Sequence, residues 1–122
     1  MNKLTKIFLS IFIILGAQAA FGCDYPKRVL VPNGNTATKD DMLEGQKEIK
    51  RYVSEMEIYL ECIETEESQA RQDIPDLQPE DEQEREEVFN KRYNAAVDEM
   101  ERLAAQFNAE VQAYRAQGSN WE

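Results

Sequence analysis

The chain has 122 residues, of which 42% are hydrophobic, 24 are acidic and 14 are basic, so its formal net charge at pH 7 is −10. This balance makes nucleic acids and anionic membrane surfaces poor partners, because both would be repelled. The chain contains no histidine, which removes the commonest general base and the commonest transition-metal ligand of proteins.

The amino-terminal segment, residues 1–19, has the pattern of a secretory signal peptide. Lys3 and Lys6 precede an apolar run over residues 7–15, and an A-x-A cleavage site closes the segment. The apolar run is about half of the roughly 20 residues that a membrane-spanning helix needs. We therefore expect export to the periplasm or exterior of a bacterial cell, with cleavage at the end of this segment or as late as Gly22.

Residues 20–38 are expected to form an extended arm that ends in a turn. Pro26 and Pro32 fix their own φ angles and favour extended geometry at the residues before them. Asn33-Gly34 is a turn dipeptide, which redirects the chain towards the first helix.

Two long helices are predicted over residues 39–72 and 79–117. Thr38 is a suitable N-cap for the first, Pro79 suits the first position of the second, and Gly118 ends the second. Apolar residues follow three- and four-residue steps in both helices, as in the seam of a coiled coil. In the first helix the seam is Met42, Ile49, Val53, Met56, Leu60, Ile63, Ala70 and Ile74, and a second stripe is Tyr52, Tyr59 and Cys62. In the second helix the stripe is Phe89, Tyr93, Ala96, Met100, Leu103, Phe107 and Tyr114.

Helices of roughly 50 Å joined by a short turn must lie antiparallel. The predicted fold is therefore all-α: one domain, an antiparallel, coiled-coil-like two-helix hairpin over residues 39–118, with the extended arm packed on the first helix. Residues 119–122 form a short tail, in which Trp121 is the one candidate anchor. A hairpin buries little surface for its size. The apolar face of the second helix is covered either by the first helix and the arm or by a second copy in a homodimer.

The two cysteines have two interpretations. In an exported chain, Cys23 and Cys62 most simply form one disulfide. The first helix rises about 36 Å from Thr38 to Cys62, and an arm of 15 residues reaches at most about 50 Å, so the pairing is possible. Closing such a loop is worth about 3 to 4 kcal/mol. Alternatively, Cys23 is the lipid-modified first residue of a lipoprotein, although the preceding Ala-Phe-Gly matches a lipobox poorly.

Acidic residues concentrate where the two helices meet. Residues 55–87 hold 14 acids against only Arg71 and Arg85. The simplest interpretation is a solvated, self-repelling helix end. The alternatives are a surface for a cationic protein or peptide, or a low-affinity cation site, although no loop with Ca²⁺-ligand spacing is present. The carboxylates of this candidate acidic surface are Glu61, Glu64, Glu67, Asp76, Glu80, Asp81, Glu84 and Glu87.

Motifs that carry catalysis are not found in the sequence. Ser54, Ser68 and Ser119 lie in no nucleophile motif, and no glycine-rich phosphate loop, CxxC pair or Glu-x-x-His motif occurs. We therefore predict no catalytic residue, no metal ligand and no cofactor, and a protein that is not an enzyme.

Several short motifs lie within residues 23–63: a Cys-Asp-Tyr-Pro start, a V-P-N-G turn, a T-A-T cap and a helix ending in Tyr-Leu-x-Cys. Together they resemble a family of small exported bacterial proteins of unassigned function. The resemblance implies no activity and carries over only the positions of Cys23 and Cys62. The sequence thus predicts an exported, non-enzymatic helical hairpin that binds another protein or serves as an envelope adaptor. The alternatives are a lipoprotein anchored through Cys23 and a low-affinity cation or polycation binder.

Overall fold

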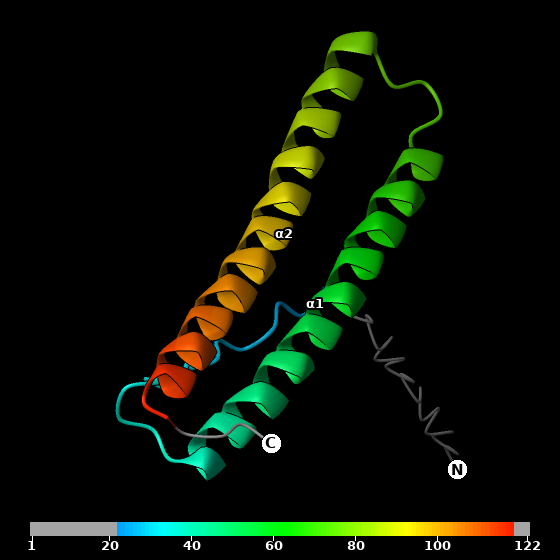
Figure 1. The fold of residues 1–122 in the computed structure, drawn as a ribbon. Coiled ribbons are helices and arrows are strands. Elements are labelled where there is room, and N and C mark those ends of the chain that lie inside the picture. The colour runs from blue at the N-terminus through cyan, green and yellow to red at the C-terminus, as the bar shows by residue number, and fades with distance from the viewer. Residues whose placement is uncertain (1–21, 119–122) are drawn as a thin grey trace, which may run out of the picture.

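Two antiparallel helices make up most of the protein (Figure 1). The computed structural model describes residues 22–118, so the predicted signal peptide and the tail with Trp121 lie outside the described residues. Helix α1 spans Lys39–Asp73 and helix α2 spans Pro79–Ala116, and the part of the chain described contains no strand. The prediction of an all-α hairpin is confirmed, with each helix boundary within one residue of the predicted one.

Helix α1 begins at a complete capping box. The Asp41 backbone N–H donates to Thr38 Oγ1 at 3.2 Å, and the Thr38 backbone N–H donates to Asp41 Oδ2 at 2.8 Å. The Thr38 backbone N–H and hydroxyl both donate to Asp41 Oδ2, and these two hydrogen bonds lower the pKa of the Asp41 carboxyl. Just upstream, the Asn35 N–H donates to Asn33 Oδ1 at 2.9 Å, so the predicted turn is closed by its own asparagine.

Helix α2 begins and ends with the residues that the sequence indicates. Pro79 occupies the start of the helix, where its missing N–H costs nothing, and three acids fill the first turn. After the last helical residue, Gly118 adopts a φ of 76° and its N–H donates to the Arg115 carbonyl oxygen at 3.0 Å. This left-handed conformation is open to glycine without steric cost and terminates the helix.

The hydrophobic core occupies only the part of the hairpin remote from the interhelical loop. The buried residues of α1 end at Ile63 and those of α2 begin at Ala96. No residue from 64 to 95 is buried, and we call this stretch, which includes the loop, the distal end. The buried hydrophobic side chains are Val29, Met42, Ile49, Tyr52, Met56, Tyr59, Leu60, Ile63, Ala96, Leu103, Phe107 and Tyr114.

The arm, coloured blue to cyan in Figure 1, contacts both helices. The Gly34 backbone N–H donates to Glu110 Oε2 on α2 at 2.7 Å. On α1, Gly45 faces Pro32 of the arm so closely that a Cβ built at this glycine would lie 2.7 Å from Pro32 Cγ. Val29 is buried in the core between these contacts and the amino-terminal end of the arm. The two glycines therefore let the arm approach both helix backbones.

The ionisation of the Tyr52 phenol can be measured and reports on the contact between α1 and the arm. Its side chain is 2% exposed, and burial, followed by a hydrogen bond with Tyr25 of the arm, raises its pKa to about 12. Because the folded-state pKa lies above the unfolded value near 10, the stabilisation is complete below pH 10 and is lost as the pH rises towards 12.

We therefore expect the free energy of unfolding to fall as the pH rises from 10 to about 12. Chemical denaturation at a series of alkaline pH values measures this fall, and phenolate absorbance follows the titration itself. In Tyr52→Phe the fall should become shallower over the same interval. An equal slope in the two proteins would contradict the assignment to Tyr52.

Candidate functional site

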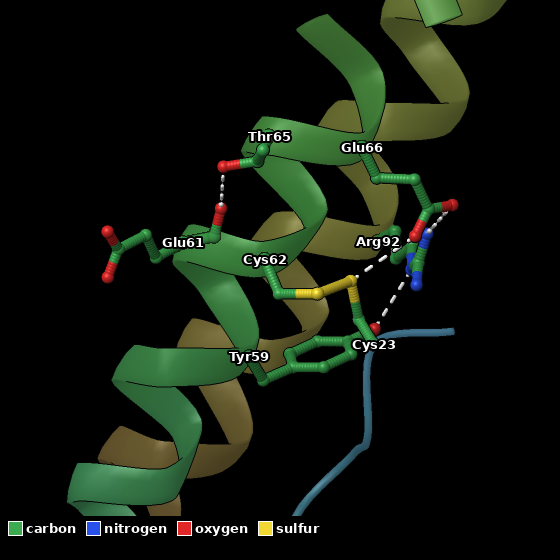
Figure 2. Close-up of a disulfide and its surroundings, with 7 residues drawn as sticks. All are labelled: Cys23, Tyr59, Glu61, Cys62, Thr65, Glu66 and Arg92. Atoms are coloured by element: carbon green, nitrogen blue, oxygen red, sulfur yellow. Dashed lines mark hydrogen bonds and ion pairs between the residues drawn. A yellow bond between two sulfur atoms is a disulfide. The ribbon is translucent and has the colours of Figure 1, made fainter. Parts of the chain in front are cut away.

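A disulfide joins the start of the arm to the carboxyl-terminal half of α1 (Figure 2). Cys23 and Cys62 form it with an S–S distance of 2.02 Å and a Cα–Cα distance of 5.7 Å. The predicted intramolecular pairing is thus present, and neither cysteine is free. A sulfur engaged in this bond is not available for the thioether of a lipoprotein.

Side chains from both helices surround the disulfide (Figure 2). Arg92 of α2 donates through Nε to Tyr59 Oη at 2.9 Å, and its guanidinium carbon lies 5.5 Å from the Tyr59 ring centre. Arg92 Nη1 is also 3.6 Å from Glu66 Oε1. The hydrogen bond that Arg92 donates to Tyr59 is the main reason why the pKa of Arg92 is raised. Tyr25 of the arm packs edge-on against Tyr59, with ring centres 5.0 Å apart.

Glu66 approaches the disulfide from α1. Its Oε2 lies 3.2 Å from Cys23 Sγ. A disulfide sulfur has no proton to donate, so this is a close contact and not a hydrogen bond to an ionised carboxylate. The disulfide and the contacts of Arg92 thus connect the arm, α1 and α2 at one level of the hairpin.

Glu67 and the two arginines of the acidic stretch neutralise one another at the distal end. Glu67 lies 3.1 Å from both Arg71 and Arg85, and Arg71 also lies 3.1 Å from Glu82 on α2. The Glu67 side chain is 20% exposed. Glu67, one of the carboxylates of the candidate acidic surface, is the centre of an ion network that bridges the two helices.

The other carboxylates of the candidate acidic surface are exposed on several faces of the distal end and the adjoining part of α1. Of these, Glu87 accepts a hydrogen bond from Gln83 at 3.1 Å. Among residues 22–118, no group of three or more histidine, cysteine or acidic side chains is arranged to hold a metal ion. These exposed residues are Glu61, Glu64, Asp76, Glu80, Asp81, Glu84 and Glu87.

The surface of the hairpin has two grooves that the sequence did not predict. The larger, about 860 Å³, lies beside the disulfide, and we call it the disulfide groove; its lining includes Ile58 and Ala70. The smaller, about 420 Å³, lies between the helices at the distal end, and we call it the distal groove; its lining includes Leu77, Val88 and Phe89. Ile58 and Val88 lie outside the apolar stripes, which is the one signal in the sequence that points to these surfaces.

The comparisons with known proteins give no relative for this chain. It matches no protein-family model, no curated protein and no solved structure. The helices of the described region include none that is both long enough and apolar enough to cross a membrane. The class that the geometry defines is therefore a disulfide-clamped helical hairpin, and function must be argued from its surfaces.

Proposed function

We propose that this chain is an exported, non-enzymatic module that binds a cationic partner protein through its distal end. The observation that carries the proposal is the lack of any buried residue from 64 to 95. Apolar side chains nevertheless occur there, with Val88 62% exposed and Ile74 42% exposed. Apolar groups left uncovered beside a polar rim are typical of interaction surfaces.

Charge argues for a basic partner. Arg71 and Arg85, the only cations between residues 55 and 87, are already held by glutamates. The carboxylates of Asp81 and Glu84, which line the distal groove, form no ion pair within residues 22–118. Two copies of this surface would repel each other, whereas a partner rich in lysine and arginine would be attracted at long range. Association should therefore weaken as salt is raised.

The disulfide and the signal-like amino terminus support export as part of the proposal. Disulfides persist in oxidising compartments such as the periplasm. Anchoring as a lipoprotein through Cys23 would need the sulfur that Cys62 engages. The intact mass of the exported protein separates the two: a loss of two hydrogens supports the soluble form, and a diacylglycerol increment on the first residue supports the anchored form.

Site-specific photocrosslinking tests the proposed partner surface. A photoreactive amino acid at Val88, in the distal end, is compared in exporting cells with the same amino acid at Leu43, which is 40% exposed on α1 far from the loop. We expect a discrete adduct with a basic protein from position 88 alone, and loss of this adduct in high salt. Equal adducts from both positions, or an acidic adduct partner, would contradict the proposal.

A polycation binder is the second candidate, because the exposed carboxylates alone would serve it. The same variants discriminate between the two. If Val88→Ser leaves binding of polylysine unchanged and no discrete protein adduct forms, charge alone accounts for the interaction.

A further inference from the structure

We infer that the disulfide groove is a separate docking site, which takes a short peptide segment carrying an apolar side chain next to a lysine or arginine. Its lining residues come from the end of the arm and from α1 only, and none comes from α2. On α1 they follow three- and four-residue steps from Ile58 through Cys62 to Asp73, so they share one helix face. The distal groove is lined on α1 by Ile63, Glu66 and Glu67, so the two grooves meet at Glu66 and differ in their other lining residues.

The floor of the groove is apolar and open. Ile58 is 67% exposed, and Ala70 and the disulfide continue the apolar surface beside it. Ile58 is not part of the seam with α2, so the hairpin gives no packing reason for an isoleucine there. A volume of about 860 Å³ is within the range of sites that enclose small ligands or a few side chains.

The charges at the groove have one sign. Glu61, Glu66 and Asp73 line it, and no lysine or arginine does. Glu66 is partly neutralised by Arg92, but Glu61 and Asp73 form no ion pair within the described part of the chain. The field in the groove is therefore negative and complements a cation held beside an apolar side chain.

The negative charge of the disulfide groove also disfavours other occupants, such as a second copy of this chain or an anionic ligand. A second copy of this face would bring three further carboxylates against the same three, which is unfavourable at neutral pH. An anionic ligand would be repelled in the same way. A peptide with alternating lysine and leucine matches both features, because leucine can contact the apolar floor and lysine can pair with the carboxylates that line the groove.

Fluorescence anisotropy with defined peptides tests this site on the exported, oxidised protein. The probe is a labelled pentapeptide of alternating lysine and leucine, compared with lysine–serine and glutamate–leucine peptides of the same length. We expect saturable binding of the lysine–leucine peptide, at least tenfold weaker binding of the other two, and at least fivefold weaker binding to Ile58→Ser and to Glu61→Gln. Leu43→Ser, on α1 outside the lining of both grooves, is the matched control and should bind as the unaltered protein does.

The variants separate this inference from the proposed function. If Val88→Ser weakens the peptide and Ile58→Ser does not, the distal end is the binding surface and the disulfide groove is not a site. If Ile58→Ser instead halves the mass measured by light scattering, a second copy occupies the groove and the inference is overturned. Binding of all three peptides with equal affinity would also overturn it. Circular dichroism confirms that each variant remains helical.

Discussion

Removing the Cys23–Cys62 disulfide is expected to lower the free energy of unfolding by about 4 kcal/mol. The bond closes a loop with a sequence separation of 39 residues, and the loss of chain entropy in the unfolded state gives about this value for such a loop. Small domains have total stabilities of about 5 to 15 kcal/mol, so a large share of the stability depends on this bond. The melting temperature should fall by roughly 15 to 30 °C.

The measurement compares the oxidised protein with the double variant Cys23→Ser and Cys62→Ser in thermal and denaturant unfolding. Both are then measured again with a thiol reductant, which should destabilise the unaltered protein to the level of the variant and leave the variant unchanged. A loss below about 1 kcal/mol would mean that the arm holds its place without the crosslink.

The second large effect is expected at Gly34. A Cβ built at this position would lie 2.9 Å from the Glu110 carbonyl carbon and 2.9 Å from the Tyr114 backbone nitrogen, and still closer to the Glu110 carbonyl oxygen. A helix backbone cannot move aside cheaply, so Gly34→Ala must displace the arm and its hydrogen bond to Glu110. We expect a loss of about 2 to 3 kcal/mol, from overpacking and a lost charge-assisted hydrogen bond.

Gly22→Ala is the matched control, because nothing lies within 4 Å of a Cβ there. Gly45→Ala is the informative intermediate case. Its Cβ meets Pro32 side-chain atoms at 2.7 and 2.8 Å, but alanine is favoured over glycine inside a helix by about 1 kcal/mol. Denaturant unfolding should therefore rank Gly34→Ala as the most damaging and Gly22→Ala as neutral. If Gly34→Ala is also neutral, the close approach of arm and α2 is wrong.

The helices could be predicted closely from the sequence because their signals are local. Thr38 with Asp41, Pro79 and Gly118 each act within one helical turn, and the structure places the helix ends within one residue of the expected positions. The pairing of Cys23 with Cys62 was also accessible, since two cysteines allow one intramolecular bond and the reach of the arm permits it.

What sequence reasoning missed depends on contacts between distant residues. Nothing near Gly45 in the sequence indicates that Pro32 packs against it, and the contact of Gly34 with α2 spans 76 residues. Glu67 pairs with Arg71 of its own helix, but its second ion pair likewise needs Arg85 from the other helix. A count of charges along the chain cannot distinguish a carboxylate in an interhelical ion network from one that faces solvent.

The disulfide lies at the boundary between two parts of the hairpin that differ in how their helices are held together. Cys62 directly precedes Ile63, the last buried residue of α1, and the amino-terminal end of the arm is bonded to α1 at this level. In the part remote from the interhelical loop, buried side chains and the disulfide hold the arm and the two helices together. In the distal end no side chain is fully buried, and the helices are joined by partly buried Phe89 and Tyr93 and by ion pairs such as Glu67 with Arg85, which salt screens. Separating the two helices therefore exposes less apolar surface in the distal end than in the rest of the hairpin, so local opening should cost least there.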